Sequence, residues 1–158
     1  MITKGQKIPS VTIKQATAEG VSDVDPAVLF AGKKVVMFTL PGAFTPTCSQ
    51  KHLPGYVAKL PELKAAGVDL VACLSVNDAF VMKAWAEQHD ALGKIVMLAD
   101  GSATFSKALG IDSDFSNYGM GVRAARGVLT FDNGVVSASW VCSALPMLAP
   151  LRMLRPSA

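Results

Sequence analysis

The chain has 158 residues, of which 51% are hydrophobic and 17% are charged, so it has the size and apolar content of one globular domain and no room for a second. The formal net charge is +3, but the Lys and Arg residues are scattered and few aromatic residues lie beside them, which argues against a nucleic-acid-binding surface. Because no apolar run approaches the length of a membrane span and residues 1–7 lack an apolar signal core, we expect a protein of the cytoplasm that contacts no membrane.

The first part of the chain predicts a strand, a polar loop and a short helix. Residues 11–17 alternate between apolar and polar types, which is typical of a half-buried strand, and the polar residues 18–23 are expected to form a loop. Asp25 precedes Pro26, and this pair is a helix-start signal because the Asp side chain caps the first turn while proline fits its first position. A short helix is therefore expected to end near Ala31.

A buried strand and the first long helix follow. The near-continuous apolar run 34–40 predicts a central strand that is buried on both faces of a sheet and ends at a Pro-Gly pair. Apolar residues recur at helical intervals over 47–66, and the prolines of this stretch predict a kink near 50–53 because a proline removes one helical hydrogen bond. Residues 68–75 have the pattern of a second buried strand.

The middle of the chain continues to alternate between helix and strand. Asn77 or Asp78 is expected to cap the next helix. Residues 95–99 predict a third strand, and residues 102–109 predict a helix that stops at Gly110. The side chains of the capped helix that we expect to face the sheet are Phe80, Val81, Ala84 and Trp85.

The last third of the chain predicts a loop, a hairpin and a terminal helix. Residues 112–125 are polar and rich in glycine, which indicates a loop with one helical turn. An Asp-Asn-Gly turn joins the apolar runs 128–131 and 135–141, as in a β-hairpin, and residues 143–154 have helical spacing but contain two prolines. Strands that alternate with helices predict an α/β fold, in one domain over residues 1–158, whose mixed sheet carries helices on both faces.

Cys48 is the candidate nucleophile. It follows the central strand where a helix begins, and the free N–H groups of a first helical turn stabilise an anion, so a thiol there loses its proton more easily than a free thiol. The alternative is an inert buried thiol, which is the common state of free cysteine. Thr45 lies three residues earlier, where Cys-x-x-Cys redox loops carry a second thiol, but a hydroxyl cannot form a disulfide. The pair favours the chemistry of one thiol on an oxygen substrate.

The run from Pro41 to Cys48, PGAFTPTC, resembles the Pro-x-x-x-Thr/Ser-x-x-Cys signature of the peroxiredoxins. With the following serine, this run is similar to the peroxiredoxin-5 subfamily of the AhpC/TSA and redoxin superfamily. Two further segments also match the pattern of this subfamily, namely VACLSVNDAF around Cys73 and the Gly-Val-Arg run that ends at Arg123. The resemblance covers most of the chain. It implies a thioredoxin-like fold and the reduction of hydroperoxides by Cys48.

The resemblance also implies roles for the residues of this run. The Cys48 thiolate would attack one peroxide oxygen, expel the other as hydroxide or alkoxide, and become a sulfenic acid. The backbone N–H groups of Thr47 and Cys48 and the Thr45 hydroxyl are expected to stabilise the charge that develops on the oxygens. Pro41 is expected to shield the sulfur from water and overoxidation, although a proline at this point also simply ends the strand.

An arginine is the remaining requirement, because a fixed cation lowers the pKa of a thiol and does not compete as a nucleophile. Arg126 opens the first strand of the hairpin and matches the position of the subfamily's active-site arginine. Arg123 is the alternative. For either residue the plain interpretation is a solvated loop arginine.

His52 and Cys73 are the other residues that bear on metal binding. His52 lies four residues after Cys48 and would share its helix face, but two ligands are too few for a closed zinc site, which needs four donors. We expect His52 to have a packing or hydrogen-bonding role and Cys73 to lie in the core. The sequence therefore predicts no metal and no other cofactor.

Cys142 bears on how a sulfenic acid would be reduced. In some relatives a distal cysteine near the C-terminal helix acts as the resolving thiol. Here the segment from about residue 141 is atypical, because its connection is short and its tail lacks acidic residues and carries extra prolines. Gly127, earlier in the chain, also stands where the family usually has an aromatic residue. Cα atoms joined by a disulfide must lie within about 7 Å of each other. Resolution by Cys142 stays open, but a one-cysteine cycle with glutathione, glutaredoxin or thioredoxin as reductant is favoured.

Three classes of function are compatible with a reactive thiol in this fold, namely a peroxidase, a peroxide sensor and a binding module. A binding module has no reason to keep Thr45, Cys48 and Arg126 together. The sequence predicts a thiol peroxidase for hydrogen peroxide and small alkyl hydroperoxides, and the alternative is a sensor that passes its oxidation to a partner protein. The resemblance also implies a homodimer that packs through loops beside the active site.

Overall fold

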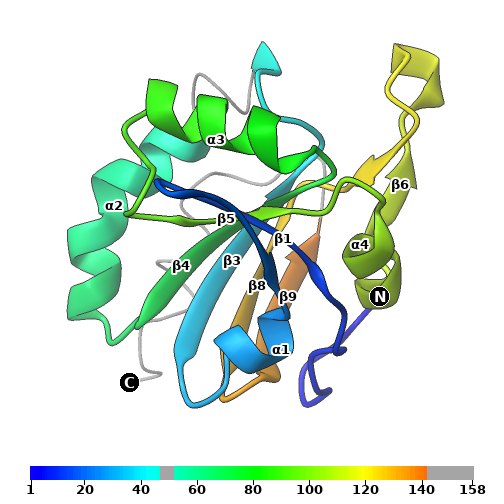
Figure 1. Ribbon diagram of the computed structural model, residues 1–158. Helices are drawn as coiled ribbons and strands as arrows, with labels where there is room; N and C mark the ends of the chain where they lie inside the picture. The colour runs from blue at the N-terminus through cyan, green and yellow to red at the C-terminus, as the bar shows by residue number, and fades with distance from the viewer. Residues whose placement is uncertain (47–51, 142–158) are drawn as a thin grey trace.

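A mixed β-sheet is the framework of the computed structural model, which describes residues 1–46 and 52–141 (Figure 1). Strand β3 runs parallel to β4, and β4 runs parallel to β5, whereas the other pairs are antiparallel. This pairing confirms the predicted mixed sheet. In spatial order its strands are β2 (Gly20–Val24), β1 (Ile13–Thr17), β5 (Val96–Ala99), β4 (Leu70–Ser75), β3 (Lys34–Leu40), β8 (Gly127–Asp132) and β9 (Val135–Val141).

Helices cover both faces of the sheet, as the sequence predicts. On one face Phe38 packs with side chains of α2 (Leu53–Ala65) and α3 (Ala79–Gln88). On the other face Met37 packs with Phe30, which follows α1 (Pro26–Leu29), and with side chains of α4 (Thr104–Leu109). Adjacent β3 residues therefore pack into two separate hydrophobic cores, one on each face of the sheet. Each large side chain buried in this way stabilises the fold by about 1.5–3 kcal/mol.

The predicted helix caps and hairpin turn are confirmed. The Asp25 carboxylate accepts a hydrogen bond from the Ala27 N–H at 2.9 Å, and Asp78 caps α3 in the same way through the Val81 N–H. Asn133 and the glycine after it have φ values of 50° and 74°, which fit the tight turn that joins β8 to β9. These short-range signals succeed because each depends on only a few neighbouring residues.

The predicted loop at residues 18–23 is wrong, because most of it forms strand β2. Thr17 pairs with Gly20, so only Ala18 and Glu19 form the turn between β1 and β2. Strand β2 lies at the edge of the sheet, and its side chains are mostly exposed. An exposed edge strand has no buried face and therefore leaves no apolar alternation to detect.

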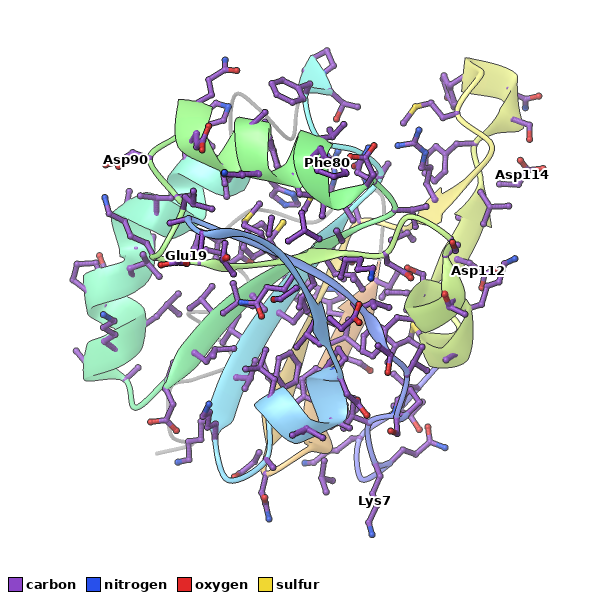
Figure 2. The ribbon with its side chains drawn as sticks, in the orientation of Figure 1. Lys7, Glu19, Phe80, Asp90, Asp112 and Asp114 are labelled. Carbon is purple, nitrogen blue, oxygen red and sulfur yellow. The ribbon has the colours of Figure 1, made fainter. Side chains whose placement is uncertain are left out.

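The predicted inner face of α3 is partly wrong. Trp85 is fully buried and Val81 is half-buried, but Phe80 is 77% exposed at the start of the helix, and Ala84 is also exposed (Figure 2). The helix instead buries Ala79, Met82, Trp85 and Ala86. Its first four residues are all apolar, so the sequence does not fix the rotation of the helix about its axis.

The region 112–125 contains the predicted helical turn, Ser116–Tyr118, but two short strands flank it. Strands β6 (Asp112–Asp114) and β7 (Val122–Ala124) pair with each other and form what we call the β6–β7 ribbon, residues 112–124. The turn of the ribbon projects away from the main sheet (Figure 1), whereas β7 contacts β3 and β4 and buries Ala124. Asp112 and Asp114 of the ribbon are labelled in Figure 2. Strands of only three residues are too short to leave a periodic pattern.

Two further predictions fall partly or wholly outside the described residues. Helix α2 is described from Leu53 to Ala65, with Pro61 inside it, whereas the expected kink near 50–53 falls largely on residues 47–51. The predicted terminal helix at 143–154 also lies outside the described residues. The assignment of residues 1–158 to one domain, with an atypical segment from about 141, stays a prediction.

Candidate active site

The loop after β3 presents Thr45 in a tight turn. The Thr45 hydroxyl donates a hydrogen bond to the Gly42 carbonyl at 2.7 Å, and the Thr45 N–H donates to the same oxygen at 3.4 Å. Phe44 has a φ of 63°, in the left-handed region that completes such turns. Because its hydrogen is used within the loop, the Thr45 hydroxyl does not have the donor role toward the peroxide oxygens that the sequence predicts. Its oxygen can instead accept a hydrogen bond from another group.

Asn77 anchors this loop to the end of the neighbouring strand. Its side-chain oxygen accepts hydrogen bonds from the Ala43 N–H at 2.9 Å and from the Ser75 hydroxyl at 2.6 Å. Sequence reasoning considered Asn77 only as a helix cap and missed this contact, because nothing local indicates that residues 43 and 77 meet. The position of the loop therefore depends on β4 as well as on β3.

Arg126 is held beside the same loop by the backbone before it. The fully buried Thr39 hydroxyl donates to the Ala125 carbonyl at 2.7 Å, and the Ala125 N–H donates to the Ile111 carbonyl at 2.8 Å. Thr39 also lies opposite Gly127 in the β3–β8 register. The half-buried Arg126 is thus fixed at the end of β3 that carries the Thr45 loop.

Three of the predicted site residues line one pocket of about 370 Å³. Pro41 and Thr45 come from the loop after β3, and Arg126 precedes β8. Thr47, Cys48 and Cys142 lie outside the described residues, and the catalytic roles of all these residues stay a prediction. The other lining residues are Pro46, Phe115, Tyr118 and Met120, of which the last three come from the β6–β7 ribbon.

Comparison with known proteins identifies the family. A protein-family model for redoxins matches residues 3–141. The chain belongs to the redoxin family. It is 50% identical over 141 residues to peroxiredoxin-2E-2, chloroplastic, of Oryza sativa subsp. japonica, a match that covers 85% of this chain and 62% of that protein. This redoxin chain thus matches less than two thirds of the length of that relative.

Solved structures of peroxiredoxins share the fold of this redoxin. Reduced Prx3 of Vibrio vulnificus in complex with H₂O₂ has a TM-score of 0.92 and 48% identity, and the match covers 98% of this chain and 100% of that chain. Peroxiredoxin 5 of Alvinella pompejana has a TM-score of 0.86 and 30% identity, with 98% of each chain covered. These similarities confirm the thioredoxin-like α/β fold.

The two candidate arginines of the redoxin chain occupy different positions. Arg126 lines the pocket, whereas the Arg123 guanidinium donates to two backbone carbonyls. Its Nε donates to the Met120 carbonyl at 2.9 Å, and its Nη1 donates to the Pro41 carbonyl at 3.2 Å. Arg126 is therefore the arginine placed to meet a ligand in the pocket.

His52 of this redoxin lies in an aromatic cluster behind the site. It is only 4% exposed, and its ring meets those of Phe38 and Tyr56 edge-on at 6.0 and 6.2 Å. Burial and, to a lesser extent, the positive charge of Arg126 lower the pKa of His52 to about 4. Within the described part of the chain, the His52 Nδ1 and the Tyr56 hydroxyl have no hydrogen-bond partner. This environment favours the predicted packing role, and the fully buried Cys73 confirms its predicted core position.

Replacement of His52 by phenylalanine should weaken the acid sensitivity of the fold. The pKa of His52 falls from 6.5 to about 4 on folding, so the unfolded state binds a proton first as the pH decreases. The stability is then full above about pH 6.5 and decreases as the pH falls to about 4, by up to about 3 kcal/mol. The free energy of unfolding in urea at pH 7.5 and pH 4, compared between wild type and His52→Phe, measures this difference.

Tyr56→Phe is the matched control for His52→Phe. It removes a buried hydroxyl from the same cluster, but burial raises the pKa of Tyr56, so the group does not titrate in acid. This variant should keep the wild-type pH dependence. An unchanged pH dependence in His52→Phe would show that other groups cause the acid sensitivity.

Proposed function

We propose that this redoxin is a thiol-dependent peroxidase that reduces hydrogen peroxide and small alkyl hydroperoxides through a sulfenic acid at Cys48. The observation that carries the proposal is the pocket in which Pro41, Thr45 and Arg126 lie together. Cys48 follows Thr45 by three residues, and three extended residues span at most about 11 Å, so the thiol belongs to the same part of the chain. The peroxiredoxin relatives, one of them solved with H₂O₂, support the assignment.

In the proposed reaction the Cys48 thiolate supplies an electron pair to one peroxide oxygen. The S–O bond forms as the O–O bond breaks, and the other oxygen leaves as hydroxide or alkoxide and takes a proton from water. The Arg126 charge favours the thiolate and the departing oxygen, and the free lone pairs of Thr45 accept the peroxide O–H. We assign the N–H groups of Thr47 and Cys48 as further donors to the oxygens.

Pro41 and the ribbon side chains give the pocket an apolar wall. Pro41 has no N–H group, so its backbone brings no water-binding donor to the site. Phe115, Tyr118 and Met120 face the same space with aromatic and thioether groups. We infer that this wall limits the water around the sulfur and accommodates the organic group of an alkyl hydroperoxide.

Within the peroxiredoxins, we assign the chain to a peroxiredoxin-5-like group with a one-cysteine cycle. The 30% identity to peroxiredoxin 5 of Alvinella pompejana over almost the whole chain supports this assignment. Glutathione, glutaredoxin or thioredoxin would then reduce the sulfenic acid at Cys48, and water would be released.

Cys142→Ser should leave glutathione-linked peroxide turnover within about twofold of wild type, because the proposed cycle needs only one protein thiol. The measurement is peroxide consumption with glutathione and glutaredoxin, followed by the intact mass after one equivalent of peroxide. A mass gain of one oxygen supports the one-cysteine cycle. Loss of two hydrogens in wild type together with complete loss of turnover in Cys142→Ser would instead make Cys142 the resolving thiol.

We also propose a homodimer whose interface includes the rim of the pocket. Phe44, Tyr118 and Val122 are 49%, 78% and 41% exposed, and they lie on the Thr45 loop and on the β6–β7 ribbon, two of the segments that form the pocket. Exposed apolar side chains grouped in this way are typical of an interface. Sedimentation should give a dimer for wild type and a monomer for Tyr118→Glu. Val28→Glu, at an exposed position on α1, should remain dimeric.

The alternative proposal is a peroxide sensor that passes its oxidation to a partner protein. The same pocket would serve an enzyme or a sensor, so the rate of peroxide consumption distinguishes the two functions. An enzyme consumes many equivalents of peroxide with glutathione and glutaredoxin or with thioredoxin, whereas a sensor stops after about one equivalent without its partner. The cytoplasmic location stays a prediction, which cell fractionation tests.

A further inference from the structure

The two walls of the pocket come from two separate parts of the chain. Pro41 and Thr45 follow the central strand β3, whereas Phe115, Tyr118 and Met120 belong to the β6–β7 ribbon. The ribbon is anchored at its β7 end, where Ala124 is fully buried, and its turn at Ser116–Tyr118 projects away from the main sheet (Figure 1). The width of the pocket therefore depends on what holds the ribbon against the loop.

Arg123 makes such a connection with a single side chain. Its Nε donates to the Met120 carbonyl at 2.9 Å, and its Nη1 donates to the Pro41 carbonyl at 3.2 Å. A guanidinium is planar and presents its N–H groups in a fixed fork, so it sets the distance between the two carbonyls that it joins. Hydrogen bonds from a charged donor are also stronger than those between neutral groups.

Gly42 gives independent support for this connection. A Cβ atom at position 42 would lie 3.1 Å from Nη1 of Arg123, 3.2 Å from Cγ2 of Thr45 and 3.3 Å from Cε of Met120. Each of these distances is shorter than an ordinary van der Waals contact. A side chain at position 42 would therefore press on Arg123, Thr45 and Met120, and the ribbon or the loop would have to move by a few tenths of an ångström to accept it.

We propose that Arg123 is a positioning residue that clasps the β6–β7 ribbon to the Pro41 carbonyl and so sets the fit of the pocket for the organic group of a hydroperoxide. The proposal rests on the proposed peroxidase function. Phe115, Tyr118 and Met120 contact the organic group through the ribbon wall, so loosening the clasp weakens the binding of a bulky apolar hydroperoxide. Hydrogen peroxide has no organic group and depends instead on Thr45 and Arg126.

The test compares Arg123→Ala and Arg123→Lys with wild type, using cumene hydroperoxide and hydrogen peroxide as probes. In Arg123→Ala, kcat/KM for cumene hydroperoxide should fall by about tenfold more than kcat/KM for hydrogen peroxide, the scale of one lost charged hydrogen bond. The amides of residues 112–124 should exchange hydrogen faster. Arg123→Lys keeps the charge and a donor nitrogen but loses the planar fork, so it should recover part of both effects.

Gly42→Ala tests the same clasp without removing the arginine. It should reproduce the faster exchange of the ribbon, and this measurement carries the test if Arg123→Ala does not fold. The preference between the two peroxides is compared in the Arg123 variants alone, because a Cβ at position 42 also lies 3.2 Å from Cγ2 of Thr45. Gly101→Ala is the matched control, because a Cβ there meets only ordinary contacts at 3.6 Å and longer, so this variant should behave as wild type.

Three results would overturn the clasp. The first is an unchanged rate of amide hydrogen exchange in residues 112–124 of the folded variants. The second is an equal loss of kcat/KM for both peroxides. The third is a raised pKa of the Cys48 thiol in Arg123→Ala, which would give Arg123 a direct electrostatic role. Failure of the wild type to consume either peroxide would refute the proposed function instead. The exchange measurement needs no turnover and would still decide whether Arg123 holds the ribbon.

Discussion

Replacement of Cys48 by serine is expected to abolish peroxide consumption, with a loss of at least about 10³-fold, because a hydroxyl at neutral pH is not an effective nucleophile toward an O–O bond. The direct measurement is the loss of hydrogen peroxide or an alkyl hydroperoxide in the presence of glutathione and glutaredoxin. The intact mass after one equivalent of peroxide should increase by one oxygen in wild type and stay unchanged in Cys48→Ser.

The control for Cys48→Ser is Cys142→Ser, which makes the same chemical change at a position outside the proposed reaction. It should keep both the turnover and the gain of one oxygen. Wild-type turnover in Cys48→Ser would rule out the assignment of the nucleophile. Since Cys73 is fully buried in β4, the search for a substitute would then begin with Cys142.

Arg126→Gln is expected to lower kcat/KM for hydrogen peroxide by on the order of 100-fold and to raise the pKa of the Cys48 thiol. A cation beside a thiol stabilises the thiolate, so its removal leaves a larger fraction of the thiol protonated at neutral pH. The pH dependence of thiolate absorbance measures the change in pKa, and steady-state kinetics measures the change in rate.

The same variant provides a second readout that does not involve sulfur. The charge of Arg126 contributes, after burial, to the lowered pKa of His52, so the pKa of His52 should rise above about 4 in Arg126→Gln. Arg123→Lys keeps its charge and should leave the His52 titration in place. An unchanged thiolate titration in Arg126→Gln would show that the helix terminus alone, or Arg123, acidifies Cys48.

The features of the fold that the sequence predicts correctly are those that a few neighbouring residues determine. The apolar run of β3 predicts a buried strand by itself. The Asp25 side chain supplies the acceptor that caps a helix, and Asn133 adopts the left-handed backbone that a tight turn needs. The grouping of Pro41 with Thr45 is local in the same sense. Arg126 is different. The sequence alone does not indicate that it lies beside that loop, and the prediction depended on its match to an arginine position of the family.

The features that the sequence does not predict depend on contacts between distant segments. Asn77 supports the Thr45 loop across two strands, and the Arg123 clasp joins residues 41 and 123. The residue types do not predict such contacts, because asparagine and arginine side chains are usually exposed to solvent. The exposure of Phe80 follows from the rotation of α3, which only packing against the sheet decides. Side-chain partners of this kind become visible only in three dimensions.

The hydrogen bond from the Thr39 hydroxyl to the Ala125 carbonyl has a consequence for inactivation by heat. Because it ties the backbone next to Arg126 to β3, an interior strand of the sheet, the side of the pocket that carries Arg126 should stay in place until the sheet unfolds. Heat inactivation that comes from displacement of Arg126 should therefore coincide with the unfolding of the sheet.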